Sequence, residues 1–237
     1  MKDISLIGFM GCGKSSVGKI LATLLPECRL IDLDTYIEEK QGKNIPEIFN
    51  EYGEAAFRRM EREALEEIFS DKSRPRAILS LGGGTVTSEQ CRQLIRQHTD
   101  CFYLRATTDT LLDNLEGHSE GRPMLNPVQA ARFDASTSSA TVEVYNVDNR
   151  HSNSLKMSEP VAECVVRRGS PTIEAQSTET SSEREALRHR IESLMQTRSP
   201  QYLATANHII DIDNQTFAQI AAKIKDAVNG NFQLFNQ

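Results

Sequence analysis

Short apolar runs alternate with amphipathic stretches along the first half of the chain. The apolar runs predict strands, and they read ISLI, RLID, AILSL and CFYL, starting at residues 4, 29, 77 and 101. Between these runs, apolar residues recur at helical spacing and predict helices over residues 15–25, 36–70, 88–97 and 108–116. Strands that alternate with helices are typical of a parallel sheet that helices cover on both faces. The pattern therefore predicts an α/β fold.

The pattern changes after about residue 125 and later returns. Residues 126–182 are dense in serine and threonine, as in ASTSSAT and QSTETSS, and they lack helical periodicity. We therefore expect an insertion that forms a small hairpin or a disordered loop. A helix over 182–197, capped by Ser181 or Ser182, is predicted next, then a strand in NHIIDID and a helix over 216–228. Residues 1–237 are expected to form a single domain that carries the insertion at 126–182.

The segment GFMGCGKS, residues 8–15, matches the GxxxxGK[ST] pattern of a phosphate-binding loop. A predicted strand precedes it and a predicted helix follows it, which argues against a chance match. Its glycines let consecutive backbone N–H groups turn towards phosphate oxygens at a helix N-terminus. Lys14 adds a positive charge for the β- and γ-phosphates, and the Ser15 hydroxyl is placed to bind Mg²⁺. The expected nucleotide cradle comprises Gly11, Cys12, Gly13, Lys14, Ser15 and Ser16.

Composition narrows the class of ligand. The chain has 237 residues, of which 25% are charged, and a net charge of -6. This balance indicates no general affinity for nucleic acid or for an anionic membrane. The five cysteines are scattered and form no CxxC pair, which fits reduced thiols better than disulfides. Neither a signal peptide nor an apolar run of membrane-spanning length is recognised. We expect a cytoplasmic protein that binds anions through local chemistry.

A phosphate loop alone is compatible with motor proteins, GTPases and small-molecule kinases. The residues that would bind the acceptor of the phosphoryl group must therefore distinguish these classes. Asp32 and Asp34 follow the second predicted strand, and we expect both side chains on one side of an extended segment at the ligand-binding edge of the sheet. One carboxylate can help to hold Mg²⁺ while the other meets an acceptor hydroxyl. Capping of the next helix by Asp34 is the alternative interpretation, and it is compatible with that role.

Two further features lie near this edge. Arg58 and Glu61 stand one turn apart on an amphipathic helix, and from the residues alone such a pair is interpreted as a solvated surface ion pair. The third predicted strand ends in a run of glycines, Gly82, Gly83 and Gly84. Because glycines remove side chains from the edge, a ligand is expected to approach the backbone there.

Six motifs, taken together and in order, make the sequence similar to the shikimate kinase family. They are GFMGCGKS, LIDLDTYIE, GEAAFRRME, LGGGTV, GRPML and RSPQY, and the resemblance covers residues 1–125 and about 183–237. It implies phosphorylation of the 3-hydroxyl of shikimate by ATP with Mg²⁺, on an adenylate-kinase-like core with a five-stranded parallel sheet. Shikimate and ATP are then the small-molecule partners, and we expect a monomer without nucleic-acid or membrane partners.

The resemblance also implies catalytic roles for Lys14, Asp34 and Arg122. Asp34 resembles the aspartate that contacts the acceptor hydroxyls, and it is placed to orient one hydroxyl and accept its proton. Arg122, within GRPML, matches the arginine of the mobile lid and contacts the nucleotide. Lys14, Arg122 and Mg²⁺ offset the charge on the transferred group. Ser15 is expected to hold Mg²⁺, and Asp32 resembles a carboxylate that acts on the ion through its water shell.

Substrate binding is implied for a second group of residues. Arg58 and Arg198 resemble the arginines that hold the substrate carboxylate, and Glu61 resembles the residue that orients Arg58. Two guanidinium forks on one carboxylate fix both its position and its orientation. Backbone contacts to the substrate are assigned to Gly82, Gly83 and Gly84.

The chain departs from the family pattern in two places. The interval between Arg122 and Arg198 is much longer because the insertion lies there, and the family's adenine-stacking arginine has no clear counterpart. Asp213 and Asn214, after the last predicted strand, are candidates for base contacts. Two alternatives stay open: a kinase for another small hydroxylated acid such as gluconate, and a nucleotide-binding regulatory module with impaired catalysis.

Overall fold

The structure is a computed structural model that describes residues 2–115 and 173–230, with side chains described from residue 184 onward in the second range. The lid residue Arg122 and the conformation expected for residues 126–172 therefore lie outside the described residues. Within the described ranges, no helix has both the length and the apolar character needed to cross a bilayer.

A five-stranded parallel sheet forms the centre of the fold, which confirms the predicted α/β class. Its strand order is β2-β3-β1-β4-β5. In register, Ile4 lies opposite Ile78 on one side and Asp100 on the other. The strands are β1 (Asp3–Ile7), β2 (Arg29–Asp32), β3 (Ala77–Ser80), β4 (Thr99–Arg105) and β5 (His208–Asp211).

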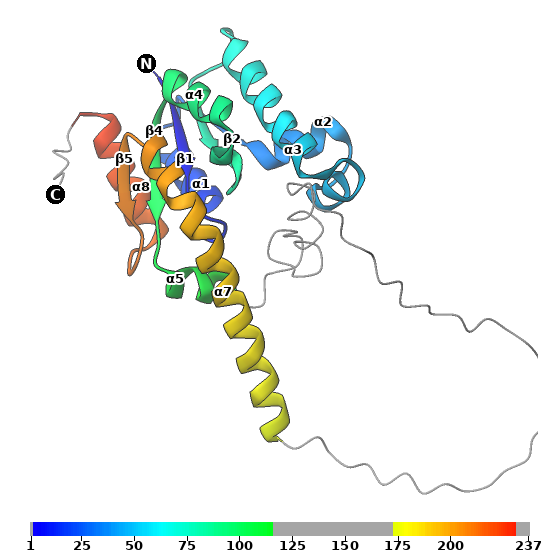
Figure 1. The fold of residues 1–237 in the computed structure, drawn as a ribbon. Helices are drawn as coiled ribbons and strands as arrows, with labels where there is room; N and C mark the ends of the chain where they lie inside the picture. The colour runs from blue at the N-terminus through cyan, green and yellow to red at the C-terminus, as the bar shows by residue number, and fades with distance from the viewer. Residues whose placement is uncertain (1, 116–172, 231–237) are drawn as a thin grey trace, which may run out of the picture.

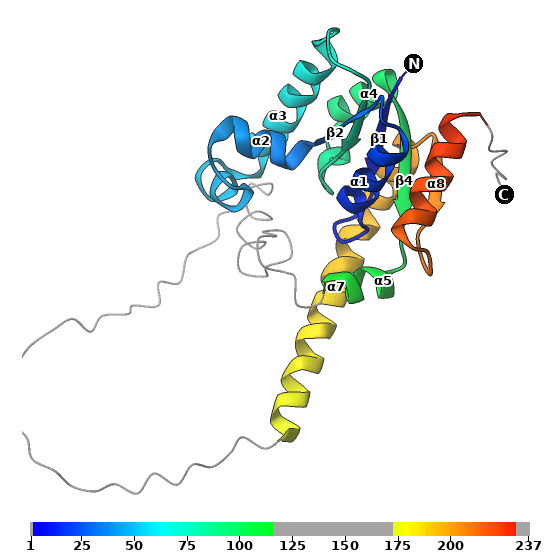
Figure 2. The same cartoon turned by 180° about the vertical axis from the view of Figure 1, so that it is seen from behind.

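Helices cover both faces of this sheet, as Figures 1 and 2 show. The helices are α1 (Lys14–Leu24), α2 (Leu33–Gln41), α3 (Ile45–Ser70), α4 (Glu89–His98), α5 (Thr108–Leu115), α7 (Ile173–Thr205) and α8 (Phe217–Val228). Helices α1 and α8 pack together on one face, whereas α4 and α7 lie on the other (Figures 1 and 2). Helix α2 and the first part of α3 stand beyond the β2 edge (Figure 1). Because the strands are covered on both sides, Ile4, Leu6 and Ile7 of β1 are all buried.

The segment after β2 differs from the prediction. Helix α2 already begins at Leu33, so Asp34 lies in its first helical turn and the two carboxylates do not share an extended segment. The helix cap is Asp32, whose Oδ1 accepts a hydrogen bond from the Thr35 N–H at 3.4 Å. The proposed cap at Asp34 is therefore wrong by two residues. Leu33 is fully buried, and its packing together with the preference of aspartate for the capping position explains the early helix start.

Helix α7 is longer than predicted at both ends. It begins at Ile173, so Ser181 and Ser182 lie inside the helix and not at its cap, and the last part of the expected insertion is helical. It also continues past residue 197 and through Pro200 to Thr205. A proline normally interrupts a helix. Here the turns around Pro200 carry Arg198 and Tyr202, both buried, so tertiary packing stabilises the helix across the proline.

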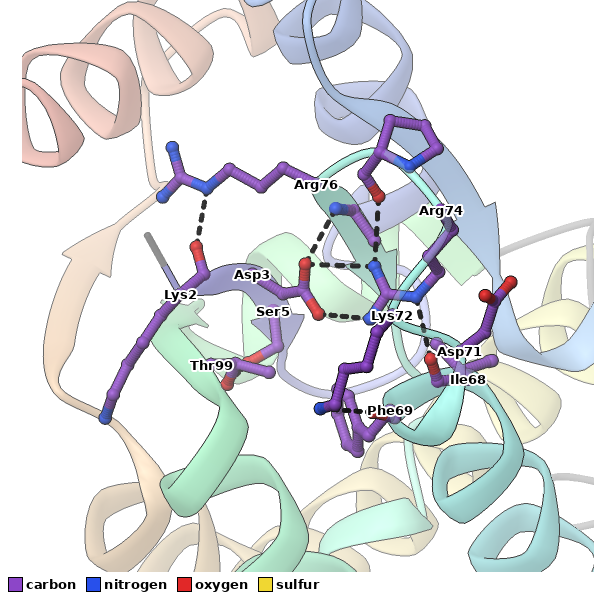
Figure 3. Close-up of polar contacts among 12 residues, drawn as sticks. Lys2, Asp3, Ser5, Ile68, Phe69, Asp71, Lys72, Arg74, Arg76 and Thr99 are labelled. Carbon is purple, nitrogen blue, oxygen red and sulfur yellow. Dashed lines mark hydrogen bonds and ion pairs between the residues drawn. The ribbon is translucent and has the colours of Figure 1, made fainter.

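Charged side chains form hydrogen bonds and ion pairs at the edge of the sheet where β1, β3 and β4 begin (Figure 3). Arg74 reaches both carboxylate oxygens of Asp3, and the Ala77 N–H donates to Asp3 Oδ1 at 2.8 Å. The Arg74 Nε donates to the Ile68 carbonyl at 2.7 Å and the Lys72 Nζ to the Phe69 carbonyl at 2.9 Å, which satisfies the last turn of α3. An open cleft of about 770 Å³ lies here. Its basic residues Lys72 and Arg74 already bind carbonyl groups at the end of α3 and the Asp3 carboxylate in β1.

The contacts of Asp3 generate a stability prediction. Burial raises the pKa of Asp3, but hydrogen bonds from Arg74 and from the Ala77 backbone outweigh it, so the net pKa lies below 3.8. The ionised carboxylate therefore stabilises the fold above that pH, and the stabilisation is lost as the pH falls through the lowered value. We expect Asp3→Asn to reduce the free energy of unfolding by about 1–3 kcal/mol at pH 7, measured by urea denaturation. A difference from the wild type that does not shrink in acid would contradict this account.

Candidate functional site

The loop between β1 and α1 has the form of a phosphate cradle. Gly13 is the residue before α1 and has a left-handed conformation with φ of 85°. A Cβ on Gly13 would lie 2.5 Å from Cε1 of Phe217, so a larger residue does not fit. The Lys14 Nζ donates to the Gly8 carbonyl at 2.8 Å and to the Phe9 carbonyl at 3.0 Å, which keeps its charge beside the loop. Because the cap residue Gly13 has no side chain to bond them, the first backbone N–H groups of α1 are available to an anion.

A cavity of about 420 Å³ opens on this loop, at the edge where β2 and β3 end. It brings together residues that the sequence analysis selected from separate motifs. They are Gly11, Gly13, Lys14, Ser15 and Ser16 of the loop and the start of α1, Asp32 at the end of β2, Asp34 in α2, and Gly83 after β3. Cys12 is fully buried and its side chain does not line the cavity, so a nucleotide contact at this position falls to its backbone.

Oxygen atoms suited to Mg²⁺ meet in the same cavity. The Ser15 hydroxyl donates to Asp32 Oδ2 at 2.7 Å, and the Ser80 hydroxyl lies 3.2 Å from the Ser15 hydroxyl. In the described part of the chain, no cluster of three or more histidine, cysteine, aspartate or glutamate side chains forms a metal site. Mg²⁺ usually takes only one or two protein oxygens and completes its shell with water and phosphate. The donor set of Ser15 and Asp32 fits that ion.

Asp34 sits between groups of both charges. Burial raises its pKa to about 7, and the nearby carboxylates of Glu61 and Asp32 act in the same direction, against the opposing effect of Lys14 and Arg58. A carboxyl group with this pKa is partly ionised at neutral pH. It is therefore able to accept a proton from a bound hydroxyl group near physiological pH.

The Arg58–Glu61 pair is not the solvated surface pair that spacing alone suggests. The Glu61 side chain is 0% exposed and the Arg58 side chain 15%, and Arg58 Nη1 donates to Glu61 Oε2 at 2.6 Å. The Thr85 hydroxyl also donates to Glu61. Burial lowers the pKa of Arg58, but Glu61 and Glu54 outweigh this effect and raise it, so the guanidinium keeps its charge. The sequence analysis missed Glu54, which binds Arg58 from one helical turn earlier.

Charged side chains pack closely against two of the three glycines that follow β3. A Cβ on Gly84 would lie 2.3 Å from Nη2 of Arg58, and a Cβ on Gly82 would lie 2.9 Å from carboxylate oxygens of both Asp34 and Glu61. Of the three glycines, only Gly83 lines the cavity. Gly82 and Gly84 thus also leave room for the charged side chains, and the backbone contacts of Gly82, Gly83 and Gly84 to a substrate stay a prediction.

Arg198 reaches the same segment from α7. Its side chain is buried, and Nη1 lies 3.4 Å from the Gly83 carbonyl, which also accepts a hydrogen bond from the Tyr202 hydroxyl. Burial lowers the pKa of Arg198, and Arg58 lowers it further, which reflects the proximity of the two cations. Within residues 2–115 and 184–230, no carboxylate pairs with Arg198 in a salt bridge. The two arginines meet at Gly83 and Gly84, although neither lines the 420 Å³ cavity.

Several residues that line the cavity were not among the sequence-based candidates, among them Asn114 and Phe217. Asn114 lines the cavity and donates to the Gly11 carbonyl at 3.0 Å, a contact for which the sequence carries no signal. Phe217 also lines it and is 41% exposed, and an apolar residue directly after the Thr216 helix cap is a detectable signal. The Asp213 carboxylate accepts from the Thr107 backbone at 3.1 Å, so it serves the start of α5.

The site belongs to a phosphotransferase of the phosphate-loop class. At one edge of the sheet it combines a phosphate loop, a hydroxyl–carboxylate pair suited to Mg²⁺, a partly ionised aspartate and two buried arginines. The family model for shikimate kinase matches residues 10–168. A shikimate kinase from Enterococcus faecalis is 43% identical over 125 residues, which is 52% of this chain and 71% of that protein. A shikimate kinase from Chlorobium chlorochromatii is 33% identical over 194 residues, 82% of this chain and 93% of that protein. The chain belongs to the shikimate kinase family.

A solved structure agrees with this assignment at the level of the fold. The shikimate kinase from Acinetobacter baumannii in complex with shikimate aligns with a TM-score of 0.67 and 24% sequence identity. The alignment covers 99% of this chain and 96% of that chain. It therefore supports the α/β architecture.

The raised pKa of Asp34 predicts a stability change of defined sign. The folded-state pKa of about 7 lies above the usual value of 3.8, so the neutral carboxyl group is favoured in the folded state. This contribution is present below 3.8 and is lost as the pH rises through about 7, because the folded protein must then ionise a buried group. We expect the stability of Asp34→Asn relative to the wild type to be higher at pH 8 than at pH 4 in urea denaturation. An equal difference at both values would contradict the raised pKa.

Proposed function

We infer that the chain transfers the γ-phosphoryl group of ATP to the 3-hydroxyl of shikimate, giving shikimate 3-phosphate. Members of its family are shikimate kinases and use ATP with Mg²⁺. One observation in the structure supports shikimate as the acceptor. The Arg58 guanidinium lies beside Gly84 and the Arg198 guanidinium beside Gly83, close to Asp34 and the phosphate loop. Both relatives compared above are shikimate kinases, so neither a gluconate kinase nor a regulatory module is favoured.

We propose roles for the residues on the acceptor side. Arg58 and Arg198 bind the shikimate carboxylate and thereby orient the ring, because a planar guanidinium matches a carboxylate in a two-pronged arrangement. Glu61 holds Arg58 in place, and the backbone at Gly83 borders the substrate. Asp34 orients the attacking hydroxyl and accepts its proton. Such positioning accounts for much of the catalysis in phosphoryl transfer, which requires little covalent chemistry from the protein.

On the nucleotide side, the proposal rests on the cavity. ATP supplies the phosphoryl group, and Mg²⁺ offsets negative charge on the phosphates. Backbone N–H groups of the loop and the start of α1 bind the phosphates, Lys14 adds its charge, and Ser15 and Asp32 hold the ion. Arg122, outside the described residues, is proposed to contact the transferred group. The single domain over residues 1–237 with its insertion, the monomeric state and the cytoplasmic location stay predictions.

An acceptor assay tests the function directly. We expect ADP release above the buffer background with shikimate as acceptor and little with gluconate, measured by a coupled assay. Release with gluconate but not with shikimate would contradict the assignment.

Arginine variants test the acceptor site. Arg198→Ala is the clearer variant, because Arg58→Ala leaves the buried Glu61 carboxylate without its partner. We expect Arg198→Ala to reduce kcat/KM for shikimate by the equivalent of about 2–5 kcal/mol, with a much smaller change in KM for ATP. Arg62→Ala is the control, since Arg62 lies on α3 but pairs with Glu66 on the surface. Equal losses for both substrates would remove Arg198 from the acceptor site.

Phe217 is proposed to stack on the nucleotide base. Its ring is partly exposed, lines the cavity and lies against Gly13 at the mouth of the cradle. We expect Phe217→Ala to raise KM for ATP about tenfold while KM for shikimate changes little, since aromatic stacking on a base contributes about 1–3 kcal/mol. Leu203→Ala, at an exposed apolar residue that does not line the cavity, is the control. An unchanged KM for ATP would place the base elsewhere.

A further inference from the structure

Arg58 is already engaged by two carboxylates of the protein. Its Nε and Nη2 donate to Glu54 Oε1 at 3.2 and 2.8 Å, while Nη1 donates to Glu61 Oε2 at 2.6 Å. A guanidinium has five N–H donors, so two remain. The proposed function, on which this inference rests, gives the same group a third carboxylate, that of shikimate. A two-pronged contact to the substrate along the Nε–Nη2 edge needs the donors that Glu54 holds, so a resident carboxylate competes with the substrate there.

The two resident carboxylates differ in their ability to leave. The Glu61 side chain is 0% exposed and also accepts from the Thr85 hydroxyl, so its release from Arg58 would leave a buried charge without its ion-pair partner. The Glu54 side chain is 21% exposed, and within the described residues Arg58 is its recorded salt-bridge partner. Because water can hydrate its carboxylate, Glu54 is the one that can move away at low cost.

The backbone next to Glu54 favours such a movement. Gly53 has φ of 77° and ψ of 172° inside α3, which interrupts the helix directly before Glu54. A Cβ built on Gly53 meets no atom within 4 Å, so the space around this residue is open. Glycine adopts conformations of both signs of φ at little cost. A change at Gly53 can therefore shift Glu54 while Glu61, two turns further along, stays packed.

Repulsion between carboxylates also favours movement of Glu54 when the substrate binds. The acceptor site holds the carboxylates of Asp34, Glu54 and Glu61 and the two guanidinium groups of Arg58 and Arg198. A substrate carboxylate added to this set would be repelled by Glu54 at close range in a poorly solvated place. Movement of Glu54 into water removes that repulsion and frees the Nε edge of Arg58.

We propose that Glu54 occupies the place of the substrate carboxylate on Arg58 and moves aside when the acceptor binds. The contact makes Glu54 a competitor of the acceptor carboxylate. A carboxylate acceptor replaces the lost ion pair with its own, whereas a neutral hydroxylated compound gains nothing at Arg58 and leaves Glu54 in place. Glu54 therefore lowers the affinity for a carboxylate acceptor and keeps the Arg58 charge paired while the site is empty.

Binding of shikimate to Glu54→Gln tests this proposal. The amide keeps the shape of the side chain and removes the competing charge, so we expect shikimate to bind about two- to fivefold more tightly by calorimetry without nucleotide, in line with the strength of a partly exposed ion pair. KM for ATP should not change. Glu51→Gln is the matched control, because Glu51 lies on the same helix but pairs with Lys43. It should leave the affinity for shikimate unaltered.

A second variant separates the possible results. Glu54→Asp keeps the charge but shortens its reach to Arg58, and it should also bind shikimate more tightly. Weaker or unchanged binding in folded Glu54→Gln and Glu54→Asp, judged by circular dichroism, would overturn the proposal and make Glu54 a fixed support of Arg58. Failure of the wild type to bind shikimate would instead contradict the proposed function. Shikimate binding by the wild type without tightening in the variants would contradict the displacement of Glu54 alone.

Discussion

The buried carboxylate of Glu61 constrains the whole acceptor side of the structure. A charge with no exposure to solvent is tolerated only with a close counter-charge and satisfied hydrogen bonds. Arg58 supplies the charge and Thr85 a hydroxyl donor. Gly82 and Gly84 follow from the same requirement, because the carboxylate and the guanidinium occupy the places where side chains would lie. One buried ion pair thus explains why an apparently ordinary helix and a run of glycines belong to one site.

That ion pair also links the acceptor side to the phosphate side. The Glu61 charge helps burial to raise the pKa of Asp34 to about 7, and Asp34 faces the cavity that Lys14 and Ser15 line. Asp32 connects α2 to the phosphate loop, since one of its carboxylate oxygens caps α2 and the other accepts a hydrogen bond from the Ser15 hydroxyl. Groups that bind phosphate, metal ion and acceptor are therefore held by rigid elements at one edge of a parallel sheet. This geometry suits a reaction that depends on positioning and electrostatics.

Particular residues show how far sequence reasoning reached. The strands were predicted well because, in a sheet covered on both faces, they are short, nearly continuous apolar runs such as that of β3 (Ala77–Ser80), whose residues are all buried. The segment around Asp32 and Asp34 was predicted wrongly, since a strand end and a helix start compete within two residues there. Helix α7 was predicted too short, because Pro200 signals an end that the packing of Tyr202 overrides.

The sequence by itself determined the parallel α/β fold, the phosphate loop from Gly8 to Ser15 and the family, because each depends on local pattern or on an ordered set of motifs. Only the tertiary structure decided that Glu61 is buried, that Glu54 shares Arg58, and that Asn114 and Phe217 reach the cavity. Burial and charge coupling arise from elements distant in the chain, and helical spacing is the same for an exposed and a buried pair. The chemistry of Arg58 and Asp34 therefore follows from their surroundings and not from their position in the sequence.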